Sequence, residues 1–293
     1  MKKFVLIIFI LVSLSACKKD INFNLNNAND IMVVDANIEN GFPPEVLLTK
    51  SLDFFKTLSA AQLSNSFIHN ALVTISNGTM THQLKEYSTL LSGGFMVYRY
   101  SIDSSRLSTA FLGKLNTHYT LHIQSEGKDY EAATFIPPLA KKADSMWWKA
   151  APFAKDSNNV AILIQIKDPP GLGNYVRYFT QKNKEPFFPG ENSVVDDQVV
   201  DNMTYQIQIE PGINRNAPIP SDSSSFKRGD VVTLKICNID RASYTFFSTW
   251  EFAFQSIGNP FSQPNKVMGN ISNGALGAFY GYGASYTTLS IPK

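Results

Sequence analysis

The sequence predicts a mainly β protein: an N-terminal β-sandwich of the immunoglobulin or transthyretin kind, followed by a second β-rich domain carrying one amphipathic helix. Three observations predict this class. Short segments alternate apolar and polar residues, turn residues such as Asn77-Gly78 and Pro137-Pro138 separate them, and one late segment repeats aromatic residues every three or four positions.

The chain begins with the pattern of a secretory signal. Met1-Lys2-Lys3 precedes an apolar run, residues 4–12, and then Leu14-Ser15-Ala16-Cys17. The run is shorter than the about 20 apolar residues of a membrane-spanning helix. Because Leu-Ser-Ala-Cys resembles a bacterial lipobox, we expect residues 1–16 to be removed and Cys17 to be lipidated. A plain signal peptide with a chance cysteine, or a signal anchor, is the alternative.

Residues 17–30 are polar and rich in asparagine, which predicts a flexible tether between the lipid and the folded chain. The whole chain has 26 lysines and arginines against 24 aspartates and glutamates. Removal of Lys2 and Lys3 with the signal leaves the two signs balanced. This balance supports neither nucleic-acid binding nor electrostatic attraction to a membrane.

We expect a first domain over residues 31–137. Its strands are predicted at 31–38, 45–50, 71–76, 79–86, 95–100, 118–124 and 129–136. Asn77-Gly78 predicts a two-residue hairpin turn, because both residues accept positive φ angles, and Glu126-Gly127 predicts another turn. Residues 51–69 fit either a loop or a short helix. Pro137-Pro138 marks the expected domain boundary, because a proline pair cannot continue a strand ladder.

The second expected domain covers residues 138–293. Residues 160–166 form the most apolar segment after the signal and predict a central, buried strand. Further strands are expected at 174–181, 203–210 and 231–237. Cys237 closes the last of these. With Cys17 acylated, Cys237 has no disulfide partner, and no histidine lies in its half of the chain, so we expect a buried, inert thiol.

The helix is expected near 241–257, with Asp240 as its N-cap and Gly258-Asn259-Pro260 as its stop. Its aromatic stripe repeats at spacings of three and four residues and consists of Tyr244, Phe247, Trp250, Phe254 and Ile257. For this stripe, core packing is the first interpretation and a ligand groove the second. The tail, residues 270–282, is rich in glycine and aromatic residues and predicts an extended segment. It either completes the sheet of the second domain or contacts a partner, with Phe279, Tyr280 and Tyr282 as the anchors.

No catalytic motif is found, and no cofactor is expected. His118 and His122 share one face of a predicted strand and could bind a metal with His82, but histidines on a solvated face explain the pattern better. Asp196, Asp197 and Asp201 form an acidic loop whose spacing is not that of an EF-hand, which leaves calcium binding open. A pair of carboxylates from distant positions, as in a glycosidase, is compatible with the sequence.

Four features of the sequence form one pattern: the lipobox, the Val33-Val34-Asp35-Ala36 segment, the Asn77-Gly78 turn, and a C-terminal run of Asn259-Pro260-Phe261, Asn270-Ile271 and residues 274–279. Together they resemble a lipoprotein family of Bacteroidota, catalogued as domain of unknown function 4249. The resemblance covers nearly the whole mature chain. It implies an outer-membrane lipoprotein, often encoded beside TonB-dependent receptors, and no reaction. Lys18-Lys19-Asp20 offers a single acid after Cys17, so the face of the membrane stays open.

Two functions of different classes follow. The first is an outer-membrane-anchored, non-catalytic binding or accessory module that serves a TonB-dependent receptor. The second is a hydrolase of cell-surface or extracellular polymers. A cleft that holds two close carboxylates or a tight histidine cluster would favour the hydrolase.

Overall fold

The computed structural model describes residues 31–52, 59–91, 94–152, 156–215, 225–257, 259 and 265–293. The expected signal peptide, the lipidation site at Cys17 and the tether lie outside the described residues. Strands dominate the described chain, which confirms the mainly β class. Across the described ranges, the helices are too short or too polar to cross a membrane.

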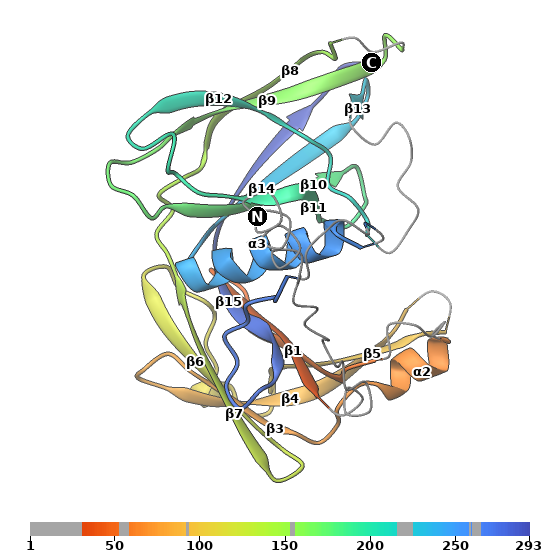
Figure 1. Cartoon of the computed structure of the whole chain (residues 1–293), viewed down its shortest axis with the longest axis vertical. Helices are drawn as coiled ribbons and strands as arrows, with labels where there is room; N and C mark the ends of the chain where they lie inside the picture. The colour runs from red at the N-terminus through yellow and green to blue at the C-terminus, as the bar shows by residue number, and fades with distance from the viewer. Residues whose placement is uncertain are drawn as a thin grey trace, which may run out of the picture.

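The N-terminal half folds into a bent sheet with the strand order β1-β2-β5-β4-β3-β6-β7 (Figure 1). The strands are β1 (Met32–Glu39), β2 (Glu45–Lys50), β3 (Leu72–Ser76), β4 (Thr81–Leu90), β5 (Met96–Ile102), β6 (Thr117–Ser125) and β7 (Lys128–Ile136). Two short helical turns join them, α2 (Ala60–Asn65) and η2 (Leu107–Thr109).

The bend in this sheet makes a sandwich. The first residues of β4 pair with β3, whereas the stretch from Leu84 to Leu90 pairs with β5, so β4 passes from one layer to the other. Apolar side chains of β1 and β2 then meet those of β3, β6 and β7 in one core, which includes Val34, Leu48, Val73 and Leu121. Alternation of buried and exposed residues along these strands is the pattern that burial of one sheet face produces.

The C-terminal half contains two packed sheets and a helix. Its elements are β8 (Ala143–Ala150), β9 (Asn159–Lys167), β10 (Tyr175–Lys182), β11 (Phe188–Val195), β12 (Thr204–Ile209), β13 (Phe226–Lys227), β14 (Val231–Ile239), α3 (Arg241–Gln255) and β15 (Leu276–Ser290). In the smaller sheet, β9 lies between β8 on one side and β12 and β13 on the other. The larger sheet continues in the order β11-β10-β14-β15.

Side chains of β14 show how the layers pack. Leu234 and Ile236 contact Ile164 and Ile166 of the smaller sheet, whereas Cys237 packs with Phe247 of α3. The larger sheet therefore lies between the smaller sheet and α3. Figure 1 shows α3 crossing the middle of the molecule, between the two halves.

The last strand joins the halves. The first part of β15 pairs in parallel with β1, from Val33 opposite Leu276 to Glu39 opposite Tyr282. Its second part, from Gly283 onward, pairs antiparallel with β14. The expected boundary at Pro137-Pro138 falls between β7 and β8, but β15 belongs to the sheets of both halves.

A charged contact reinforces this joint. The Glu39 carboxylate, at the end of β1, accepts hydrogen bonds from Lys235 Nζ of β14 and from the Tyr286 hydroxyl of β15. The Lys235 ammonium lies 5.4 to 6.0 Å from the ring centroids of Phe179, Phe187, Tyr282 and Tyr286. Cation–π attraction from four rings stabilises a charge that is largely withdrawn from water.

Most local expectations are confirmed. Glu126-Gly127 forms the two-residue turn between β6 and β7, with both φ angles positive. Ser59 and Gln62 make a reciprocal cap that turns part of the ambiguous 51–69 segment into α2. The turn at Asn77-Gly78 was predicted wrongly in length: Ser76 pairs with Thr81, so the loop has four residues. The longer loop is stabilised by the Asn77 Oδ1 atom, which accepts hydrogen bonds from the backbone N–H groups of Thr79 and Met80.

Candidate functional site

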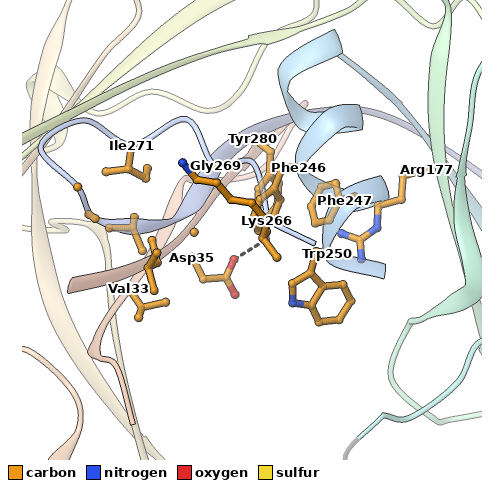
Figure 2. Close-up of a pocket in the computed structure, with 16 residues that line it drawn as sticks. Val33, Asp35, Arg177, Phe246, Phe247, Trp250, Lys266, Gly269, Ile271 and Tyr280 are labelled. Atoms are coloured by element: carbon orange, nitrogen blue, oxygen red, sulfur yellow. Dashed lines mark hydrogen bonds between the residues drawn. The ribbon is translucent and has the colours of Figure 1, made fainter. Parts of the chain in front are cut away.

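A pocket of about 820 Å³ lies where α3 faces the β1–β15 pair (Figure 2). Val33 and Asp35 of β1 lie on one side of it, and Phe247, Trp250 and Arg177 lie on the other. The segment that leads into β15, from Lys266 to Ala275, contributes to the rim. Pockets of this volume accommodate ligands of small-molecule size.

Helix α3 is held in place from its first turn. The Asp240 carboxylate caps the helix by accepting a hydrogen bond from Ser243 N. The same carboxylate accepts hydrogen bonds from Thr134 Oγ1 and Phe135 N of β7, so the cap also ties the helix to the N-terminal sandwich. The helix is therefore positioned between the two halves, as one wall of the pocket.

The buried stripe of α3 differs from the aromatic stripe in the sequence. Ser243, Phe247 and Glu251 are buried, whereas Phe254 and Ile257 are exposed. Phe247 packs edge-on against Tyr280, with centroids 4.8 Å apart. The aromatic residues of the helix thus divide between the core, the pocket and the surface, and Trp250 lines the pocket.

Glycines let the pocket floor form. Gly277 has φ +91°, and a Cβ there would lie 1.9 Å from the carbonyl oxygen of Val34. Only glycine can accept both conditions. Asn270 then holds the incoming segment against β15, because its Oδ1 accepts a hydrogen bond from Phe279 N and its Nδ2 donates to Phe279 O. The extended conformation expected for residues 270–282 is confirmed for residues 276–282, which belong to β15, whereas residues 272–274 form a turn with positive φ at Asn273 and Gly274.

Asp35 and Tyr280 meet across the β1–β15 pair. The Tyr280 hydroxyl donates a hydrogen bond of 2.5 Å to Asp35 Oδ1, drawn as the dashed line in Figure 2. Burial raises the pKa of Tyr280 well above its ordinary value, and the Asp35 charge raises it further. The hydroxyl is therefore protonated at neutral pH and serves as a donor to the carboxylate.

Arg177 is a buried cation at the far wall. Its Nε donates to Ser193 Oγ at 3.1 Å, and its Nη1 donates to the Tyr282 hydroxyl at 2.8 Å. Its guanidinium lies 3.6 Å from the centroid of Phe247. Only 7% of the residue is exposed. Each of these hydrogen-bonding partners is a neutral hydroxyl group.

Glu251 is linked to Arg177 through the hydroxyl group of Ser193. Ser193 donates from both Oγ, at 2.5 Å, and N, at 3.0 Å, to the Glu251 carboxylate. Arg215 Nη2 lies 3.5 Å from the same carboxylate. Burial lowers the pKa of Arg215, Glu251 raises it, and the charge of Arg177 lowers it again. The Glu251 carboxylate is therefore in direct contact with Arg215 and linked to Arg177 only through Ser193.

The residues singled out in the sequence have different positions. Trp250 and Tyr280 both line the pocket. Tyr282 is buried behind it and accepts the hydrogen bond from Arg177. Phe279 is fully buried in the core of the sandwich, away from any surface. The exposed large side chains of β15 are instead Leu276 and Tyr286.

Sequence reasoning missed Arg177, Asp35 and Lys266 as parts of one site. Arg177 falls within the strand expected at 174–181, where it is the one cation among Tyr175, Val176, Tyr178 and Phe179. A cation within this apolar and aromatic run was the available signal. Cys237 is fully buried, and burial raises the pKa of its thiol to about 12, which leaves it protonated.

The histidines do not assemble a metal site within the described residues. His69 Nδ1 lies 2.5 Å from Glu86 Oε1, and His82 is buried and bonded to Thr109 and to the backbone of Asp103. His122 pairs with Asp129, and His118 packs on Phe135. Each imidazole thus has a local structural partner.

The acidic loop is arranged differently from the sequence expectation. Asp197 and Asp201 converge with Asp168, with one carboxylate oxygen of each within 4.8 Å of the others, whereas Asp196 accepts a hydrogen bond from Tyr244. Lys141 Nζ lies 2.5 Å from Asp168 Oδ1, and both side chains are fully buried. An ammonium group thus already neutralises the innermost carboxylate.

The remaining acids of this cluster hold a turn. Asp197 accepts hydrogen bonds from Gly173 N and from Asn174, and Asp201 accepts one from Gly171 N. Burial would raise the pKa of Asp197, but the hydrogen bonds from Asn174 and Gly173 outweigh it and lower the pKa. The cluster therefore explains the conformation of the 168–174 loop.

Comparison with known families shows the family to which the chain belongs. A search of curated proteins found no match. The family model described as domain of unknown function (DUF4249) matches residues 18–288, which contain every described strand of both halves, except the last two residues of β15, and every wall of the pocket. The protein is therefore a member of the DUF4249 family.

Proposed function

We propose that this protein is an outer-membrane-anchored lipoprotein that acts without catalysis, as a binding module serving a TonB-dependent receptor in the same membrane. The observation that carries the proposal is the pocket of about 820 Å³ between α3 and the β1–β15 pair. Its walls are mainly apolar and come from both halves of the chain. Such a pocket suits capture of a ligand.

Anchoring rests on the lipobox at Leu14-Ser15-Ala16-Cys17. A lipid on Cys17 would confine the folded chain to the plane of the membrane, which raises its effective concentration near a receptor there. A weak contact then suffices for a working complex. The resemblance to outer-membrane lipoproteins encoded beside TonB-dependent receptors supports this receptor class.

A hydrolase would need two carboxylates, or a nucleophile and a base, at one cleft. In the pocket, Asp35 is the one carboxylate among the described lining residues, and Tyr280 donates to it. In a shallower groove on the N-terminal half, Glu86 accepts hydrogen bonds from the backbone of Asn70 and from Tyr100, and Asp103 accepts them from Ser105. These carboxylates have structural partners, which favours the binding module.

The test is co-purification from native membranes. The full-length chain with a C-terminal affinity tag is isolated in mild detergent after crosslinking in cells, and bound outer-membrane receptors are identified by mass spectrometry. We expect one TonB-dependent receptor with the intact chain and much less of it with Cys17→Ala, which removes the anchor but leaves the fold. Recovery of no receptor with the intact chain would end the accessory proposal.

A further inference from the structure

The electrostatics of the pocket wall are unbalanced. Arg177 is almost fully buried, and among the described residues no carboxylate forms an ion pair with it. The Glu251 carboxylate is linked to Arg177 only through Ser193 and is also in contact with Arg215. A buried charge without direct compensation is costly, because water no longer solvates it. The wall therefore has an excess of positive charge.

A second cation stands at the rim. Lys266 lines the pocket, is exposed, and makes no ion pair with any described residue. Asp35 is the opposing charge, but Oδ1 of this carboxylate already accepts the Tyr280 hydrogen bond. The lining thus contains two cations and one acid that is partly satisfied. Complementary charge in a ligand would be negative.

The rest of the lining is apolar. Phe246, Phe247 and Trp250 provide aromatic surface from α3, and Val33, Ile271 and Leu276 provide aliphatic surface. Figure 2 shows the Arg177 guanidinium directed toward Phe247 and Trp250, so its charge lies beside this apolar surface. A ligand that occupies the pocket would place an apolar body on these side chains and a polar end near Arg177.

We propose that the pocket binds a small amphipathic anion, whose single acidic group is held by Arg177 and whose apolar body packs on the face of α3, while Lys266 adds positive charge at the rim. The proposal rests on the proposed binding function and names its ligand class. A planar acidic group suits Arg177, because guanidinium donors match carboxylate or sulfonate oxygens in geometry. An uncharged molecule of the same shape gains only the apolar contacts.

Two fluorescent probes separate these contributions. 1-Anilinonaphthalene-8-sulfonate carries an aromatic body and one anionic group, and N-phenyl-1-naphthylamine has the same aromatic body without the charge. Both are titrated into the purified full mature chain. We expect the sulfonate to bind about tenfold tighter or more, as a charge-assisted hydrogen bond in a buried site would give.

Variants locate the charge. Lys266→Met and Arg177→Met are expected to weaken sulfonate binding by about threefold and about tenfold respectively, while the neutral probe is unaffected. Lys149→Met is the matched control, because Lys149 is an exposed lysine on β8, outside the pocket lining. Trp250→Phe is expected to reduce the energy transfer from tryptophan to the bound probe, because Trp250 lines the pocket whereas Trp147 and Trp148 lie on β8.

Arg177 belongs to a buried network, so Arg177→Met could unfold the chain. In that case the proposal is tested by comparing the two probes on the intact chain and by the Lys266→Met variant, whose substitution is at an exposed position. Equal affinity for both probes in the intact chain, or sulfonate binding that is unchanged in Lys266→Met, would overturn the anion proposal. Neither result bears on receptor binding, which the co-purification test measures separately.

Discussion

The side chain of Asn40 forms two hydrogen bonds with the backbone of Ala284, as a neighbouring strand would. Its Oδ1 accepts a hydrogen bond of 2.6 Å from Ala284 N, and its Nδ2 donates one of 3.4 Å to Ala284 O. This pair lies where β15 leaves β1, at Glu39 opposite Tyr282, and begins to pair with β14. The side chain therefore satisfies backbone groups at the point where the strand changes partner.

Asn40→Ala should destabilise the protein, because it leaves the buried Ala284 N–H without an acceptor. The expected loss is about 1–3 kcal/mol in the free energy of unfolding. Urea unfolding followed by circular dichroism measures it. Asn65→Ala, at an exposed position on α2, is the control and should cost less than about 0.5 kcal/mol. Equal effects of the two changes would contradict the role of Asn40.

Two aromatic residues of α3 should respond differently to truncation. Phe247 is buried between Arg177 and Tyr280, so Phe247→Ala should cost about 3–5 kcal/mol of unfolding free energy. Trp250 faces the pocket and is half-buried, so Trp250→Ala should cost less than about 2 kcal/mol. Parallel urea titrations compare the two variants. A larger loss for Trp250→Ala would mean that this ring is core after all.

Glu86 should make stability depend on pH. Burial alone would raise its pKa, but hydrogen bonds from His69, Asn70 and Tyr100 outweigh burial and lower the pKa. Because the folded-state pKa lies below the unfolded value of 4.5, the carboxylate stabilises the fold above that pH. This stabilisation is lost as the pH falls through the folded-state pKa.

Glu86→Gln tests this linkage, because glutamine keeps the shape and cannot ionise. At pH 7 the variant should be less stable than the wild-type chain, and the difference should shrink when both are unfolded near pH 3. Thermal unfolding across this pH range gives the comparison. A difference that stays constant with pH would show that the Glu86 charge contributes nothing.

Cys17→Ala should release the protein from membranes, if Cys17 carries the lipid anchor. Fractionation of cells that express the wild-type chain or the variant, with a salt wash of the membrane pellet, measures the distribution. The wild-type chain should stay in the pellet, and the variant should move to the soluble fraction. Retention of the variant after the wash would exclude the lipid anchor.

The strands could be predicted from the sequence because their signal is local. Residues 118–124 alternate apolar and polar side chains, and β6 shows the same alternation of burial. Residues 160–166 are apolar except for Gln165, and β9 lies inside its sheet. Both patterns involve residues that are close in the sequence, so they can be recognised without knowing which strands pair with each other.

The pocket could not be predicted, because its walls come from four distant segments. The period of α3 placed Trp250 and Phe247 on one stripe, but the buried side chains include Glu251, whose partner Ser193 lies on β11. Likewise, nothing local in residues 276–290 reveals that one strand pairs with both β1 and β14. Such arrangements depend on contacts between residues far apart in the chain.

The sharing of β15 between the halves also determines when the protein can fold. Pairing of β1 with β15 brings together residues at the two ends of the described chain, and such distant pairing slows folding. During synthesis, β1 and β14 both have an open edge until the final 15-residue strand is made. Open edges invite pairing with other chains. Only a polypeptide that includes β15 can close both edges, so each half depends on the same strand to complete its sheet.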